Sequence, residues 1–141
     1  RSLLHRVIIG TDSPVGAGVV PLGMLRTVLF VSSLCKVPAE IAWAMASGSV
    51  AEAYNLNTGK VEIGREADLI AMDAPWDCNA SDALAAIEFG DVPAVTMIMV
   101  DGEVISHRAR NTTLTDRLVN VDGKEVSLKT REGILFSSGA V

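Results

Sequence analysis

The chain has 141 residues, of which 49% are hydrophobic and 21% are charged, a balance typical of folded globular proteins rather than disordered ones. Its formal net charge of −5 argues against a nucleic-acid partner, because nucleic-acid binding needs a basic surface. No apolar run reaches the roughly 20 residues that span a bilayer, so we expect no membrane partner either.

Two further features bear on the cellular setting of the chain. Cys35 and Cys78 have no metal-ligand spacing, and a lone pair of cysteines in an acidic chain indicates reduced thiols in a cytoplasmic protein. The sequence begins at Arg1, without an initiator methionine or a signal-type leader. We interpret it as the C-terminal part of a longer protein.

A short apolar run at residues 7–9 predicts a buried strand that stops near a carboxylate. The run is entirely β-branched, as in strands covered on both faces. Gly10 and Pro14 then end the strand near Asp12, because proline keeps the residue before it out of the helical region. In α/β barrels the carboxyl ends of strands carry catalytic groups. Aspartate is also a common turn residue, so both interpretations of Asp12 stay open on the residues alone.

The loop that follows contains two glycines, Gly16 and Gly18, and no large polar side chain up to residue 20. Its backbone can therefore approach a ligand closely, although an ordinary connection between a strand and a helix has the same composition. The loop has no Lys-Ser or Lys-Thr pair of the phosphate-binding kind, which argues against a nucleotide site.

Three helices are predicted next. Pro21 suits the first turn of a helix over residues 21–35, which has a broad apolar surface. A second helix should run over residues 39–47 and end at Gly48. Ser49 and Glu52 have the spacing of a capping box, which predicts a short third helix up to residue 54.

The second half of the chain predicts β structure around one more helix. We expect strands at residues 60–63 and 68–73, and a helix at residues 83–89 that Asp77 or Ser81 caps and Gly90 closes. Strands at residues 95–100 and 103–106 flank Asp101-Gly102, the signature of a type I′ hairpin. A second Asp-Gly pair at residues 122–123 echoes this hairpin.

Several segments in this order resemble the C-terminal end of the amidohydrolase superfamily. They are Gly-Thr-Asp-Ser-Pro at residues 10–14, the helical stretch at residues 45–51, and the β segments at residues 59–70 and 100–104. The resemblance covers residues 7–106. Residues 12–18 and 21–26 are most similar to the enamidase type, whose members open a cyclic enamide.

The resemblance implies an α/β fold: the C-terminal fragment of a (β/α)8 TIM barrel, with its last strand and helices, plus the C-terminal share of a small β-sandwich. Residues 1–54 would end the catalytic barrel, residues 55–110 would belong to the composite β-sandwich, and residues 111–141 would be a tail to which we assign no role. The activity implied is hydrolysis of a C–N bond in a small-molecule cyclic amide.

The resemblance also implies roles for individual residues. Asp12 would be a metal ligand and a proton shuttle, and Ser13, Gly16 and Gly18 would contact the substrate. The cofactor would be a divalent metal, zinc first and iron or manganese as alternatives, in a mono- or binuclear site completed by ligands outside this chain. We expect the chain alone to be inactive, because a catalytic metal needs three or more protein ligands.

The chain lacks the His-x-His pair and the bridging lysine or glutamate of the superfamily. We interpret His5 and His107 as ordinary histidines, and Asp68, Asp73 and Asp101 as structural acids. The exposed apolar faces expected around residues 7–9 and along the first helix favour association, so we expect a homo-oligomer. The alternative function is a non-catalytic, β-rich structural or oligomerisation module.

Overall fold

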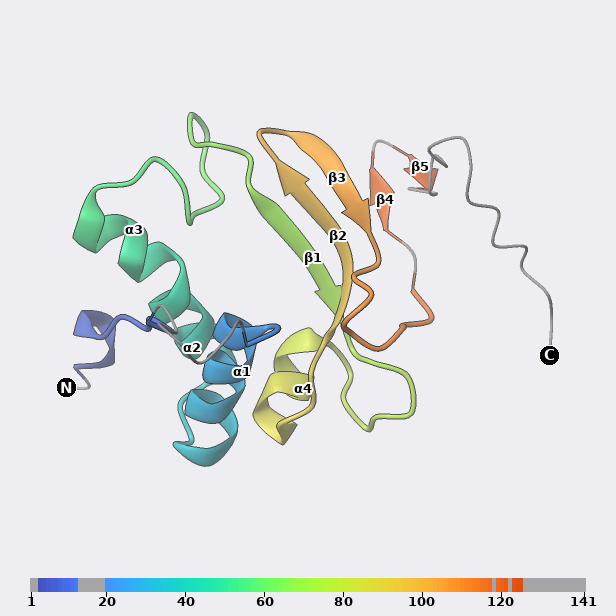
Figure 1. The fold of residues 1–141 in the computed structure, drawn as a ribbon, viewed down its shortest axis with the longest axis horizontal. Coiled ribbons are helices and arrows are strands. Elements are labelled where there is room, and N and C mark those ends of the chain that lie inside the picture. Colours follow the sequence, from blue (N-terminus) through green and yellow to red (C-terminus); the bar gives the residue numbers. More distant parts are fainter. Residues whose placement is uncertain (1–2, 13–19, 118, 122, 126–141) are drawn as a thin grey trace, which may run out of the picture.

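The computed structural model describes residues 3–12, 20–117, 119–121 and 123–125 of the chain. Helices form one part of the molecule and a three-stranded antiparallel sheet forms the other, with a small hairpin beyond the sheet (Figure 1). In chain order the elements are η1 (Leu4–Arg6), α1 (Gly23–Leu29), η2 (Phe30–Leu34), α2 (Ala39–Ala46), α3 (Gly48–Tyr54), β1 (Leu69–Asp73), α4 (Ala83–Phe89), β2 (Ala94–Val100), β3 (Glu103–His107), β4 (Asn120–Val121) and β5 (Lys124–Glu125).

The first long helix forms, but it begins later than predicted and changes its winding. It starts at Gly23 rather than at Pro21, because Leu22 adopts a left-handed backbone conformation with φ 57° that does not fit a right-handed helix. The continuation of α1, η2, is π-helical. The hydroxyls of Thr27 and Ser33 donate to carbonyls four residues earlier, at 3.0 and 2.7 Å, a contact that often bends helices.

The next two helices form with different boundaries from those predicted. α2 ends at Ala46, and Gly48 opens α3 instead of closing α2. The predicted capping box is wrong, because Ser49 already lies inside α3 and Glu52 forms an ion pair with Lys60 instead. The hydrogen bond from Lys60 holds the pKa of Glu52 below its ordinary value.

The helices share one hydrophobic core. Ile87 of α4 and Val28 of α1 are fully buried, and Ile9 brings the segment before α1 into the same cluster. Fully burying a large aliphatic side chain contributes about 1.5–3 kcal/mol, so this cluster fixes α4 against the helices from the first part of the chain. Its buried members are Ile9, Leu25, Val28, Leu29, Ala39, Ala42, Met45 and Ile87. No helix in the described ranges has the length and apolar character to cross a membrane.

The strand predicted at residues 60–63 is wrong. That stretch is irregular and ends in a turn, where the amide of Arg65 donates to the carbonyl of Glu62 at 3.2 Å. Val61 and Ile63 have relative exposures of 86% and 108%. Alternating residues form a strand only beside a hydrogen-bonded neighbour, and no sheet of the described residues includes this stretch. The guanidinium of Arg65 also bonds the carboxylate of Glu62 and lowers its pKa.

The sheet confirms the predicted hairpin. β2 and β3 pair antiparallel around Asp101 and Gly102, whose φ angles of 50° and 78° are both positive, as a type I′ turn requires. β1, which matches the strand predicted at residues 68–73, pairs antiparallel with the other edge of β2. An irregularity interrupts each of the two pairings, and bulges of this kind increase the local twist of a sheet.

α4 forms over the predicted residues but has a different cap. Asp82, rather than Asp77 or Ser81, accepts a hydrogen bond from the amide of Ala85 at 2.9 Å, as an N-cap residue does. This bond is the main reason why the pKa of Asp82 lies below its ordinary value. Gly90 closes the helix in the left-handed conformation, as predicted.

The chain after β3 is tied back to the first strand. Asp73, at the end of β1, is 9% exposed and accepts hydrogen bonds from the hydroxyl of Thr115, at 3.0 Å, and from the guanidinium of Arg117. The amide of Trp76 donates to the carbonyl of Leu114 at 2.8 Å. Beyond this segment, β4 and β5 pair on either side of the second Asp-Gly, as the echo of the first hairpin suggested.

Candidate active-site edge

Asp12 lies at the end of a segment that is anchored to the helices. The amide of Ile9 donates to the carbonyl of Met45 in α2 at 2.9 Å, and the Ile9 side chain is buried in the core. Asp12 follows three residues later, is exposed, and has a φ of 53°. This left-handed conformation is uncommon outside glycine, although aspartate adopts it more readily than most residues. The carboxylate is therefore carried at the surface, close to a fixed point of the backbone.

The strand predicted at residues 7–9 is wrong for the described chain. Strands are defined by hydrogen bonds to a neighbouring strand, and no sheet of the described residues includes this segment. Val7 and Ile8 remain 44% and 41% exposed. The β-branched run thus keeps apolar side chains available for contact without belonging to a sheet in this structure.

Ser13, Gly16 and Gly18 lie outside the described residues, so their contact with substrate stays a prediction. The next residue that the structure describes is Val20, whose carbonyl accepts a hydrogen bond from the amide of Gly23 at 3.1 Å. This bond makes a turn immediately before α1.

A cavity of about 390 Å³ opens between the residue before Asp12 and the beginning of the first helix. Its size is within the range of about 300–1,000 Å³ found for small-molecule sites. Among the described residues that line it, Arg26 carries a charge. The lining residues are Thr11, Val20, Gly23, Arg26, Thr27 and Phe30.

The other acids near strand ends act in the fold, as predicted. The carboxylate of Asp68 accepts a hydrogen bond from the amide of Asp101 at 3.0 Å, which fastens the start of β1 to the hairpin turn. Asp73 bonds Thr115 and Arg117, residues 42 and 44 positions later. Sequence reasoning missed these two partners, because no local pattern in residues 111–117 signals a pairing over such a distance.

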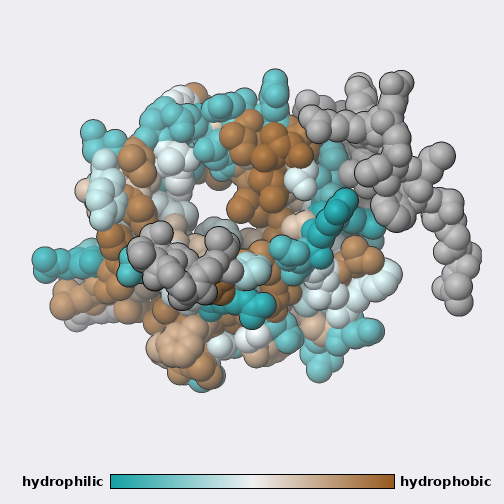
Figure 2. All heavy atoms as spheres, viewed as in Figure 1, coloured by the Kyte–Doolittle hydropathy of each residue, from teal (hydrophilic) through white to brown (hydrophobic). Residues whose placement is uncertain are grey.

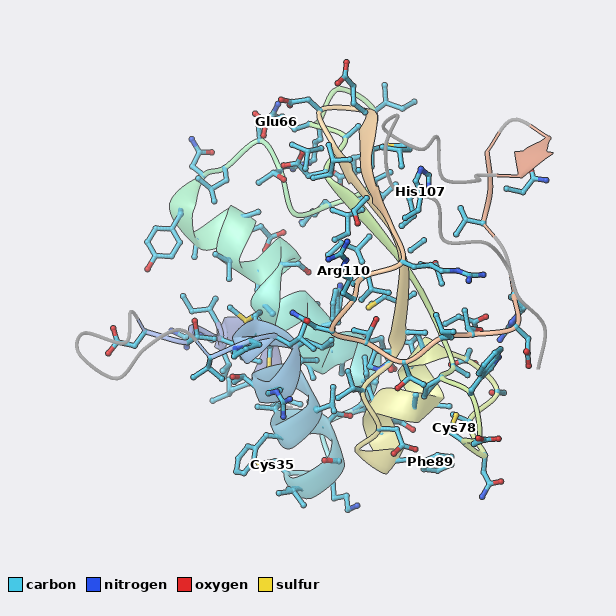
Figure 3. The ribbon with its side chains drawn as sticks, turned by 45° about the vertical axis from the view of Figure 1, so that its right-hand side comes forward. Cys35, Glu66, Cys78, Phe89, His107 and Arg110 are labelled. Carbon is cyan, nitrogen blue, oxygen red and sulfur yellow. The ribbon has the colours of Figure 1, made fainter. Side chains whose placement is uncertain are left out.

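Asp12 can supply one donor of a larger metal site. Groups of three or more histidine, cysteine, aspartate or glutamate side chains that could hold a metal are absent from the described part of the chain. Cys35, Cys78 and His107 lie on separate parts of the molecule (Figure 3), and both cysteines are free thiols. Since a catalytic metal needs three or more protein ligands, any site that includes Asp12 takes most of its ligands from elsewhere.

The chain matches known proteins over most of its length. A sequence profile of the amidohydrolase family matches residues 1–105. The enamidase of Eubacterium barkeri is 42% identical over 121 residues, which make up 86% of this chain and 31% of that protein. The crystal structure of enamidase, described as a new member of the amidohydrolase superfamily, matches with a TM-score of 0.77 and 43% identity, over 81% of this chain and 30% of the solved one. This chain therefore spans less than a third of the length of these relatives.

Proposed function

The chain belongs to the amidohydrolase family, and we propose that it is the C-terminal part of a metal-dependent enzyme that hydrolyses a C–N bond of a cyclic amide. The observation that carries the proposal is Asp12, an exposed acid three residues beyond a backbone anchor, within a region that matches the family profile. The 42% identity to enamidase supports a cyclic amide as the substrate class.

The proposed architecture follows the change from helices to strands along the chain. Residues 1–54 would end a (β/α)8 barrel. Residues 55–110 would be the C-terminal share of a β-sandwich, and residues 111–141 a tail without an assigned role. The half-exposed apolar side chains of Val7 and Ile8 support this assignment, because exposed apolar side chains of this kind mark surfaces that contact other protein segments.

Asp12 would hold the metal together with ligands from the rest of the protein. A carboxylate oxygen is a suitable ligand for zinc, our first candidate, and iron or manganese are alternatives, in a mono- or binuclear site. The bound metal would polarise the amide carbonyl and make the attacking water more acidic.

The carboxylate of Asp12 would also transfer a proton during hydrolysis. It would accept the proton of the water that attacks the amide carbon, and then deliver that proton to the ring nitrogen as the C–N bond breaks. The product is one ring-opened molecule that carries both a carboxylate and the freed nitrogen group, so one water is consumed for each bond broken. Ser13, Gly16 and Gly18 would approach the substrate through their backbone.

We also propose a cytoplasmic homo-oligomer. The free thiols of Cys35 and Cys78 support a reducing compartment. The exposed apolar side chains on the helices, Phe30 and Leu34 among them, support association between subunits.

The test of the catalytic assignment is Asp12→Asn in the full-length protein. Asparagine keeps the size of the side chain but cannot accept the proton, and loss of a general acid–base group costs on the order of 10²–10⁴ in rate. Because proton transfer belongs to the transition state, kcat and kcat/KM should fall together. Steady-state kinetics on a cyclic amide, with metal content measured on the same samples, checks this.

Asp68→Asn is the matched control, because Asp68 bonds the amide of Asp101 in the sheet and should leave kcat nearly unchanged. If Asp12→Asn keeps more than about a tenth of the wild-type kcat at unchanged metal content, the loss is smaller than acid–base catalysis predicts. Asp12 would then be a turn residue, and the chain could be the non-catalytic module.

A further inference from the structure

The turn before α1 holds a strained residue. Leu22 has a φ of 57° and a ψ of 27°, a left-handed conformation that non-glycine residues keep only where their surroundings impose it. The amide of Gly23 donates to the carbonyl of Val20 at 3.1 Å, and the amide of Arg26 donates to the carbonyl of Leu22 at 2.9 Å. The first bond closes the turn at residues 20–23, and the second joins the carbonyl of Leu22 to the first turn of α1.

The side chain of Arg26 adds a third bond to the same turn. Its Nε donates to the carbonyl of Pro21 at 3.2 Å, so the guanidinium reaches back from α1 across the turn. The cavity of about 390 Å³ opens beside this turn, and Arg26 and Thr27 both line it. Among the described residues, the hydroxyl of Thr27 bonds the Gly23 carbonyl and the guanidinium of Arg26 bonds the Pro21 carbonyl, so Arg26 is the side chain that holds the first half of the turn.

The turn also touches the residue that precedes Asp12. A Cβ placed on Gly23 would lie 3.7 Å from Cγ2 of Thr11 and 3.8 Å from Cβ of Val20, which are ordinary van der Waals contacts. Gly23 therefore lies beside Thr11, with room for little more than a methyl group between them. A shift of the turn toward Thr11 would press on the backbone next to Asp12.

We propose that Arg26 is a positioning residue: it fixes the turn at residues 20–23 and, through Gly23 and Thr11, the placement of the Asp12 carboxylate. This inference rests on the proposed function, because placement matters for rate only if Asp12 takes part in proton transfer. In this proposal the guanidinium of Arg26 does not touch the substrate. It acts by holding the backbone that positions Asp12.

The experiment compares Arg26→Met and Arg26→Lys in the full-length protein. Methionine keeps the length and loses the donor, and we expect kcat to fall on the order of tenfold, since a misplacement of about 1 Å can cost 10²-fold. KM should stay within about twofold, because ground-state binding is not removed. Lysine can still donate to the Pro21 carbonyl, so Arg26→Lys should recover part of the lost kcat at unchanged metal content and melting temperature.

Arg110→Met is the control, because Arg110 is an exposed arginine beyond the third strand (Figure 3). Its kcat should match the wild type. An Arg26→Met enzyme with wild-type kcat would overturn the inference, and so would a fall in kcat that follows a loss of metal or of melting temperature, or one that lysine does not relieve. Asp12→Asn is measured alongside: a slow Asp12→Asn enzyme beside an unaffected Arg26→Met enzyme refutes the positioning role alone, whereas an active Asp12→Asn enzyme refutes the proposed function.

Discussion

Gly59 and Gly64 share a backbone conformation but differ in their surroundings. Their φ angles are 77° and 89°, in the region that side chains other than glycine rarely adopt. A Cβ on Gly59 would lie 2.9 Å from Cβ of Ala51 and 2.9 Å from the carbonyl oxygen of Ser47, whereas a Cβ on Gly64 would meet nothing within 4 Å. Gly59 is thus the point where the chain leaving α3 folds back onto that helix.

Alanine at the two positions should therefore have unequal effects. Gly64→Ala should lower the free energy of unfolding only by the cost of placing alanine in the left-handed conformation, about 1–2 kcal/mol. Gly59→Ala should add an overpacking cost of about 1–3 kcal/mol, because the backbone at Ser47 cannot move aside as a flexible side chain can. Calorimetry on the full-length protein should show a clearly lower melting temperature for Gly59→Ala. Equal melting temperatures would mean that the turn does not pack on α3 in solution.

Among the elements, α4 connects the two parts of the molecule. It lies between β1 and β2 in the sequence, but Ile87 packs in the core that α1 and α2 form. Figure 1 shows α4 beside these helices, below the end of the sheet. Side chains of this short helix, together with Val92 before β2, therefore join the sheet to the helices.

Removing the buried side chain of α4 should weaken this connection. Ile87→Ala should cost about 2–5 kcal/mol, the range for large-to-small substitutions in a core. Leu84→Ala is the matched control, because Leu84 lies on the same helix and is 43% exposed. We expect a much smaller loss of stability for Leu84→Ala. Thermal unfolding of the full-length variants measures both, and similar losses would show that α4 does not hold its position through Ile87.

The sequence predicted an element well where the whole signal for it lies within a few neighbouring residues. The hairpin needs only Asp101 and Gly102 to fix its turn, and α4 needs only its apolar period and Gly90. The strands at residues 7–9 and 60–63 failed because a strand also needs a partner, which the described chain does not supply. The boundary at Gly48 failed because two adjacent helices compete for the same residues.

The residues of the candidate site also differ in whether a local pattern signals them. Asp12 could be proposed from the sequence because its motif is local and the resemblance covers it, and its role stays a prediction. The role of Arg26 could not be predicted from the sequence. Its hydrogen bond to the Pro21 carbonyl depends on the turn at residues 20–23, which forms because Leu22 is not helical. The pairing of Asp73 with Arg117 was equally out of reach, since the two residues lie 44 positions apart.

At the scale of the whole molecule, apolar surface is exposed on both parts. Figure 2 shows brown side chains gathered over the sheet and over the helices on one face. Val61, Ile63 and Ile105 are more than half exposed around the sheet, and Phe30 and Leu34 are more than half exposed in η2, the continuation of α1. Patches of this kind mark surfaces that contact other protein segments.

The isolated 141-residue chain should therefore associate in solution. Its exposed apolar side chains, with those of Val7 and Ile8 among them, favour contact with a second chain. Light scattering should give masses above the 14.9 kDa of one chain. Val61→Ser combined with Ile63→Ser leaves the charge unchanged and should lower the associated fraction without abolishing it, because Phe30 and Leu34 remain exposed. A monodisperse monomer with one cooperative calorimetric transition would mean that these faces need no partner.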